Sequence, residues 1–124
     1  MLNIAAVFFG GGIGAVLRFI TGLILVHKIR TNLPIATFLV NIVGCLLIGF
    51  LYILFTEKIQ ISPTIKYALI AGFCGGLTTF STFSLELVEM IQNNQYLTAL
   101  LYIIASIVIG ILFVYIGGYF AKLL

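Results

Sequence analysis

The chain has 124 residues, of which 63% are hydrophobic and 7% are charged, with a formal net charge of +3 and a mean hydropathy of +1.32. A soluble domain carries charge on about a quarter of its residues, so this composition excludes a soluble globular protein. The few scattered basic residues also argue against a nucleic-acid partner.

The predicted elements are the apolar runs between short polar clusters, and each run is long enough to cross a bilayer as a helix. Pro34 suits the opening turn of the second helix. No run alternates with period two, so strands are a poor interpretation. The sequence therefore predicts an all-α membrane protein, with residues 1–124 forming one four-helix transmembrane domain. The predicted spans are approximately residues 4–26, 34–55, 64–91 and 96–120.

The first span carries a charged residue at membrane depth. Arg18 interrupts the apolar run and no basic leader precedes it, so we expect a retained span rather than a cleaved signal peptide. The first span also carries a stripe of residues spaced by four positions, Gly10, Gly14, Arg18 and Gly22. Small residues at this spacing let helices approach closely in lipid, so packing is the simplest role for these glycines.

The second and third spans add further polar groups at membrane depth, Asn41 and Glu86. A buried amide needs hydrogen-bond partners, and both a structural and a functional role remain open for Asn41. Ionisable groups in a membrane normally face protein or a water-filled cavity. Because four helices enclose little protected interior, these groups indicate a dimer.

The third span has an unusual centre, from Gly72 to Ser84, where two adjacent glycines precede a run of threonines and serines. Such a sequence is a poor helix former. At 1.5 Å per residue, the stretch from Thr64 to Cys74 covers about 16 Å, half the hydrocarbon thickness. We therefore expect the helix to be broken at Gly75 and Gly76, near the membrane midplane. Non-helical backbone at this depth must be enclosed by protein or line a cavity, and transporters use it to hold small ions, although a silent kink remains an alternative.

The chemistry around the predicted break suits two kinds of ion. Backbone carbonyls freed by the break favour a hard cation held in place. Beyond it, serine and threonine hydroxyls and the Asn41 amide can donate hydrogen bonds without carrying negative charge. Phe80 and Phe83 add the positive edges of their rings. A small anion could be held there weakly enough to leave again.

Basic residues are shared almost evenly between the two sides of the predicted bundle. Lys58, Lys66 and Lys122 fall on one side, and Lys28 and Arg30 on the other. This distribution gives little orientation under the positive-inside rule. It indicates either a weak topology signal or a chain that inserts both ways up and pairs as an antiparallel, dual-topology dimer about a twofold axis in the membrane plane.

Three motifs give the chain a close resemblance to the CrcB/Fluc fluoride channels across essentially its full length. Residues 10–18 resemble the family's Gly-Gly-x-x-Gly-Ala-x-x-Arg opening. Residues 41–44, with Gly49 beyond, resemble its second-helix pattern. Residues 75–83 are similar to its most specific signature, Gly-Gly-x-Thr-Thr-Phe-Ser-Thr-Phe.

The resemblance implies an antiparallel homodimer with two pores and a structural sodium ion on its axis, and no organic cofactor. Backbone carbonyls of Gly75 and Thr78 from both chains would hold the sodium. Some relatives pair two different chains with degraded half-sites, whereas both phenylalanines and Asn41 are present here, which favours a homodimer.

The resemblance also implies roles along the fluoride pathway. Phe80 and Phe83 would form paired aromatic boxes, and Asn41 would be their polar partner. Arg18 would lie near an aqueous vestibule, with Glu86 at the far end of the track. The implied hydroxyl track consists of Ser81, Thr82 and Ser84, with Tyr102 and Ser106 of the fourth span as neighbours.

The function implied by the resemblance is passive export of cytoplasmic fluoride, which reduces fluoride toxicity. Fluoride enters as neutral HF and dissociates inside, and a negative membrane potential contributes about 2.3 kcal/mol per 100 mV to expelling each anion. The expected location is the plasma (inner) membrane of a prokaryote, as a multi-pass protein. Residues 10–15 also fit a dinucleotide-binding pattern, but no strand precedes them, so the match is fortuitous.

Three other classes of protein share some of these sequence features. A small multidrug exporter needs a carboxylate in the first span, where this chain has Arg18. An enzyme needs a nucleophile or metal cluster, yet His27 stands alone, and Cys45 and Cys74 lack metal spacing and are expected to be reduced packing residues. A packing subunit of a larger complex would explain the glycines but not the hydroxyl track.

Overall fold

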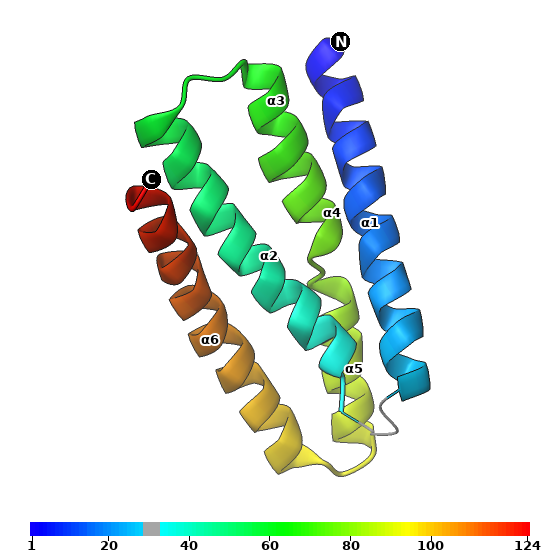
Figure 1. The fold of residues 1–124 in the computed structure, drawn as a ribbon. Coiled ribbons are helices and arrows are strands. Elements are labelled where there is room, and N and C mark those ends of the chain that lie inside the picture. Colours follow the sequence, from blue (N-terminus) through cyan, green and yellow to red (C-terminus); the bar gives the residue numbers. More distant parts are fainter. Residues whose placement is uncertain (29–32) are drawn as a thin grey trace.

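The computed structural model describes residues 1–28 and 33–124, and all regular elements within these ranges are helices. Together they make four long rods joined by short connections (Figure 1). The polar connection predicted at 27–32, including Arg30, lies for the most part outside the described residues. The elements are α1 (Leu2–Lys28), α2 (Ile35–Ile53), the π-helix η1 (Leu54–Lys58), α3 (Pro63–Tyr67), the π-helix η2 (Ala68–Cys74), α4 (Gly75–Leu77), α5 (Ser81–Gln92) and α6 (Tyr96–Lys122).

Four helical stretches are long and apolar enough to cross a membrane, which confirms the predicted number of spans. Their limits are close to those predicted from the sequence. The described spans are Leu2–Val26, Ile35–Lys58, Pro63–Gln92 and Tyr96–Lys122.

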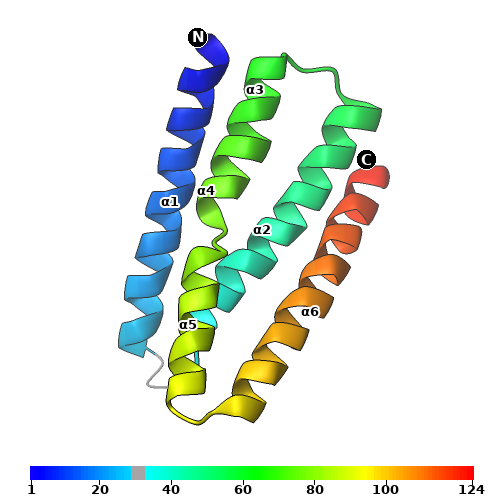
Figure 2. The same ribbon diagram turned by 180° about the vertical axis from the view of Figure 1, so that it is seen from behind.

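Successive spans run in opposite directions, so that both termini and the connection before α3 lie at one end of the molecule (Figures 1 and 2). Ser62 begins α3 by accepting a hydrogen bond from the Ile65 amide at 3.4 Å, and Pro63 follows it in the first turn. At the opposite end, Asn94 adopts a positive φ of 59°. This left-handed residue closes the short turn between α5 and α6.

Two helix pairs pack through glycines with almost no space between their backbones. In the α2–α6 pair, a Cβ added to Gly49 would lie 2.1 Å from the Val114 carbonyl oxygen, and one on Gly117 would lie 2.0 Å from that of Leu46. No side chain fits at such separations. The glycines therefore allow the close approach that is typical of helices in lipid.

The second pair joins α1 to the first half of the third span. A Cβ on Gly10 would lie 2.1 Å from the Ala68 carbonyl oxygen, and one on Gly14 would lie 2.3 Å from that of Phe73. The packing role expected for the glycine stripe of the first span is confirmed at these two positions. At Gly22 an added Cβ would meet no atom of this chain within 4 Å, so its packing role stays a prediction.

The non-helical stretch of the third span does not lie where the sequence placed it. Gly75 and Gly76 belong to α4, and residues 78–80 lie between α4 and α5, with Thr78 in an extended conformation at φ −82° and ψ 160°. The physical reason is the packing of α4, because a Cβ on Gly76 would lie 2.3 Å from the Gly11 carbonyl oxygen. Gly76 therefore serves helix contact, and the chain departs from helical geometry at the threonines that follow.

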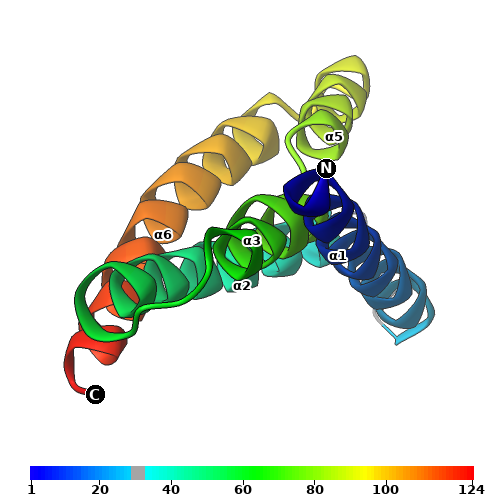
Figure 3. The same ribbon diagram turned by 90° about the horizontal axis from the view of Figure 1, so that it is seen from above.

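The third span divides the molecule into a packed part and an open part. Seen along the bundle, α2 lies between α6 and the first half of this span, whereas α5 meets α2 only near the start of α2, where Thr37 donates a hydrogen bond to Glu86 (Figure 3). A small core of Met90, Ala99 and Tyr102, with Phe38, Phe83 and Leu87 packed against it, ties α5 to α6. The face between α5, α6 and α2 is left open.

Candidate functional site

An open groove of about 550 Å³ runs along α2 between α6 and the third span. It brings together residues that the sequence predicted to act together, although they come from three spans. The non-helical residues 78–80 are part of its lining. The predicted site residues that line this groove are Asn41, Gly75, Thr78, Phe80, Phe83 and Ser106.

The amide of Asn41 is engaged by the backbone of the third span. Its Nδ2 donates to the Thr79 carbonyl oxygen at 3.1 Å, and its Oδ1 accepts from the Thr79 backbone N–H at 2.8 Å. This pair satisfies the amide that the sequence analysis identified as needing partners. It also removes the Thr79 N–H from the helix ladder, so the Gly75 carbonyl four residues earlier lacks its helical partner.

Arg18 also contacts the non-helical stretch. Its Nη1 donates to the Thr78 carbonyl oxygen at 3.0 Å. The guanidinium is therefore attached to the centre of the third span, on one of the two carbonyls that the resemblance assigned to sodium. A carbonyl oxygen has two lone pairs, so this contact leaves one of them unused.

The hydroxyl groups at the start of α5 form a cluster around a residue that the sequence analysis did not single out, Thr79. Its Oγ1 lies 3.1 Å from Thr82 Oγ1 and 3.4 Å from Ser81 Oγ. Ser84 is separate from this cluster, because its Oγ donates to the Phe80 carbonyl oxygen at 2.9 Å. In the sequence, the pair of threonines directly after the two glycines is the feature that could have identified Thr79 as a site residue.

The two phenylalanines of the signature lie close together on the groove. The ring centroids of Phe80 and Phe83 are 6.1 Å apart with their planes at 40°, and Phe83 also lies 4.9 Å from the ring of Tyr102. Phe80 is 80% exposed, whereas Phe83 packs against the α5–α6 core. Of the two rings on the groove, that of Phe80 is thus largely exposed and that of Phe83 is held in place by packing.

Glu86 accepts two hydrogen bonds from other spans. Tyr102 Oη donates to its Oε2 at 2.9 Å, and Thr37 Oγ1 donates to its Oε1. Thr37 is 7% exposed and lies one turn before Asn41 on α2, a spacing that would have identified it. Glu86 is therefore held between two hydroxyl donors near the middle of α5.

Ser106 has an incompletely satisfied side chain. Its Oγ is buried and finds no hydrogen-bond partner among the described residues, and the residue lines the groove. A buried hydroxyl without a partner carries a desolvation cost. Such an atom suits a group that a ligand or a second chain would complete.

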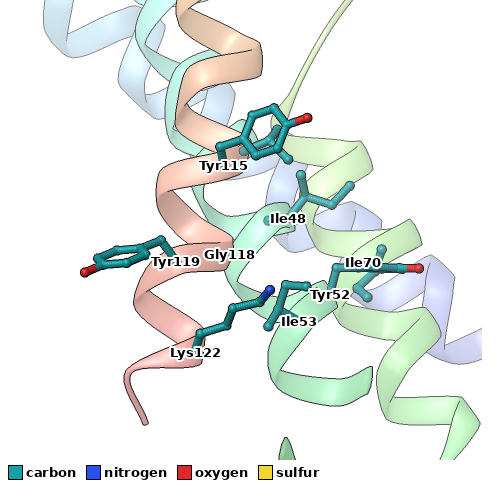
Figure 4. Close-up of a pocket in the computed structure, with 10 residues that line it drawn as sticks. Ile48, Tyr52, Ile53, Ile70, Tyr115, Gly118, Tyr119 and Lys122 are labelled. Carbon is teal, nitrogen blue, oxygen red and sulfur yellow. The ribbon is translucent and has the colours of Figure 1, made fainter. Parts of the chain in front are cut away.

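A second cavity, of about 590 Å³, continues from the groove toward the end that carries both termini. Ile48 and Ile70 line both spaces. Its walls are mostly apolar, and Lys122 reaches over it from α6 toward Ile53 (Figure 4). Although Tyr52, Tyr115 and Tyr119 line this cavity, none of the site residues predicted from the sequence does, so the groove remains the candidate site.

The part of the chain that the structure describes contains no group of three or more histidine, cysteine or carboxylate side chains able to hold a metal. Cys45 and Cys74 both line the groove as free thiols. Any cation bound at the groove would therefore depend on backbone oxygens such as those of Gly75 and Thr78.

Comparison with known proteins gives a consistent result over the whole chain. The model of the CrcB-like protein, Camphor Resistance (CrcB) family matches residues 5–118. A protein of Hydrogenobaculum sp. named fluoride-specific ion channel FluC is 46% identical over 99% of this chain and 100% of its own length. A protein of the same name from Flavobacterium psychrophilum is 44% identical over 98% of both chains. Fluoride-specific ion channel FluC 1 of Staphylococcus aureus is 42% identical over 90% of this chain and 89% of its own.

Proposed function

The chain belongs to the CrcB family of multi-pass ion channels, which are not enzymes, and from this premise we propose that it is a fluoride-selective channel that exports fluoride by passive electrodiffusion. The observation that carries this proposal is the single groove lined by Asn41, Phe80 and Phe83. All three offer positive hydrogen or ring-edge character to a ligand.

The electrostatics of the groove support an anion as its ligand. Its described lining residues include no carboxylate. The ring edges and the amide of the groove bind an anion without a full positive charge, which allows it to leave. Arg18, attached to the Thr78 carbonyl, adds a positive charge near the groove without lining it. We propose that it favours anion access from the adjoining vestibule.

The pathway would continue from the groove along α5. Ser81 and Thr82 lie at its start, and Ser106 lines the groove wall on α6. Glu86 and Tyr102 would form the far end, where the hydroxyls that donate to Glu86 reduce the repulsion between its carboxylate and a passing anion. Ser84 would contribute less than the other hydroxyls, since it is bonded to the Phe80 carbonyl.

The groove is open on one side, and we propose that a second, antiparallel copy of the chain closes it to form two pores. The exposure of Phe80 and the unsatisfied Ser106 hydroxyl support this arrangement. The even distribution of basic residues between the two sides of the bundle would permit insertion in both orientations. The third span would then cross its partner near the membrane midplane.

The carbonyls of Gly75 and Thr78 fit the structural sodium that the resemblance implies. Gly75 lacks its helical partner and an added Cβ there would meet open space, while the Thr78 oxygen retains one lone pair. Two carbonyls from each chain would supply four oxygens, the ligand type that hard cations prefer. When bound, sodium would neutralise the converging carbonyl dipoles at the axis.

This channel would protect a prokaryotic cell from fluoride by letting it leave across the plasma membrane. Fluoride that enters as HF is released as an anion inside. The membrane potential then drives it out with about 2.3 kcal/mol per 100 mV. No energy source beyond this potential is required.

The test is anion efflux from liposomes that contain the purified protein and are loaded with fluoride or chloride, with valinomycin relieving the potential. We expect rapid fluoride release with chloride retained. Equal release of both anions would contradict selectivity. No release from a folded dimer would favour a packing subunit or a required second chain.

A further inference from the structure

Residues 78–80 lie where two helices end, and helix ends leave backbone groups without helical partners. Thr79 lies in the middle of this stretch and is 9% exposed. The proposed pathway gives it no role, yet its backbone and side chain each contact a pathway residue.

The peptide of Thr79 fixes the orientation of the Asn41 amide. A backbone N–H can only donate and a carbonyl can only accept, so Oδ1 must face the Thr79 nitrogen and Nδ2 must face the Thr79 oxygen. An amide without such partners could turn either its oxygen or its nitrogen toward the groove. Here the acceptor end is turned toward the backbone, and the second hydrogen of Nδ2 remains for the groove that Asn41 lines.

The hydroxyl of Thr79 fixes the direction of a second donor in the same way. The Thr82 backbone N–H donates to Thr79 Oγ1 at 3.2 Å, so the Thr79 hydroxyl directs its own hydrogen to Thr82 Oγ1, 3.1 Å away. Because Thr82 Oγ1 accepts this bond, its own hydrogen is left for another acceptor. The same contact closes the first turn of α5, between Phe80 and Phe83.

We propose that Thr79 is a positioning residue that turns the Asn41 amide and the Thr82 hydroxyl so that both offer hydrogens, not lone pairs, to an anion on the pathway, the amide in the groove and the hydroxyl at the start of α5. This inference rests on the proposed fluoride channel and deepens it, because it assigns the residue that sets the polarity of the donors. A small, hard anion gains most from two fixed donors, and a larger anion that bonds more weakly gains less. Thr79 therefore acts on selectivity as well as on throughput.

The test compares Thr79→Val, which keeps the shape and loses the hydroxyl, with Thr79→Ser, which keeps the hydroxyl. Fluoride and chloride efflux are measured on purified dimers, together with the permeability ratio of the two ions from the reversal potential. We expect Thr79→Val to lower the fluoride-to-chloride ratio by about tenfold, the equivalent of one hydrogen bond. Thr79→Ser should retain the ratio and the rate of the unmodified chain.

The matched control is Thr21→Val, which removes the same hydroxyl from a residue that donates only to the Leu17 carbonyl oxygen within α1. It should leave the ratio unchanged. A purely structural role for Thr79 predicts a lower melting temperature in Thr79→Val with an intact ratio, and this result would overturn the inference. If Thr79→Val does not fold, the smaller Thr79→Ala takes its place, with the same criterion.

The outcome for the unmodified chain separates this inference from the proposed function. Absence of fluoride flux in the unmodified dimer overturns the function and the inference together. Selective flux in the unmodified dimer, with the same ratio in Thr79→Val or Thr79→Ala, overturns the inference alone.

Discussion

The two halves of the third span are held in place by different kinds of contact. The half before residues 78–80, Pro63–Leu77, packs backbone against backbone on α1 through Gly10, Gly14 and Gly76. The half after them, α5, is attached through side chains, by the hydrogen bonds of Glu86 and the ring contact between Phe83 and Tyr102.

The first half of the third span therefore positions residues 78–80, and the second half carries side chains that can face a ligand. Backbone packing through glycine leaves no side chain free to act, but it places residues 78–80 firmly against α1. Side-chain attachment leaves the face of α5 open to the groove, where Phe80 lies almost free. Substitutions in the first half should therefore affect folding, and those around the second half should affect conduction.

The largest effect is expected where the backbones are closest. In Gly14→Ala, the new methyl would lie 2.3 Å from the Phe73 carbonyl oxygen, and overpacking of this kind costs about 1–3 kcal/mol or more. We expect a large loss of monodisperse protein after detergent extraction. Gly12→Ala is the control on the same helix, since its methyl would meet no atom within 4 Å. Equal yields from both variants would contradict the packing described for α1.

The next largest effect is expected from charge in the groove. Asn41→Asp keeps the acceptor for the Thr79 N–H but loses the donor and places a negative charge beside the anion path. At an effective dielectric constant near 20, two charges about 5 Å apart repel by about 3 kcal/mol. Fluoride efflux should fall at least about a hundredfold.

The same substitution at Asn3 provides the control for Asn41→Asp. Asn3 accepts a hydrogen bond from Thr64 at the end of the bundle, at 2.6 Å, and does not line the groove. Asn3→Asp should conduct normally. Normal conduction by Asn41→Asp would place Asn41 outside the pathway.

A smaller effect is expected from the aromatic rings. Phe80→Ile and Phe83→Ile keep an apolar side chain but remove the positive ring edge, a contribution of about 1 kcal/mol. Each should lower fluoride efflux by about fivefold while the dimer still forms on size-exclusion chromatography. Phe19→Ile, at an exposed position of α1, should have no effect. Unaltered flux in both groove variants would remove the ring edges from the mechanism.

The smallest effect is expected from sodium. Exchange of sodium for a large organic cation should lower the melting temperature of the dimer by several degrees, because an ion that binds only the folded state stabilises it by mass action. The measurement is thermal unfolding at several sodium concentrations. A melting temperature indifferent to sodium would contradict a role for the Gly75 and Thr78 carbonyls.

Much of this architecture could be predicted from sequence, because membrane spans depend on composition alone. The four apolar runs had to be helices, since the backbone must satisfy itself in lipid. Phe80 and Phe83 could be singled out because hydroxyl side chains stand between them in the third span, and Asn41 could be grouped with them because its amide is also a donor without negative charge. All three line one groove.

The remaining features depend on tertiary contacts that no single segment encodes. Gly75 and Gly76 suggested a helix break by their propensity, but Gly76 is needed for contact with α1, and tertiary packing overrides propensity. The contact between Arg18 and the Thr78 carbonyl joins residues 60 positions apart. Thr37 shares a face of the second span with Asn41, but only the fold shows that it meets Glu86. Thr79 stands in the signature, but only the fold shows that it meets Asn41 and Thr82.

The π-helix η2, Ala68–Cys74, has a consequence for how this chain can vary. A π-helical turn accommodates one more residue than an α-helical turn and occurs most often at functional sites. Deletion of one residue from this segment would remove the extra residue of the wide turn and leave an ordinary α-helix, with the stretch that follows close to its present phase. Deletion of a residue in α4, where no wide turn can absorb the change, would rotate everything after it by about 100°, the step of one residue, and turn Thr79 away from Asn41. The orientation of the ion-facing backbone should therefore tolerate the loss of one residue in η2 better than the loss of one in α4.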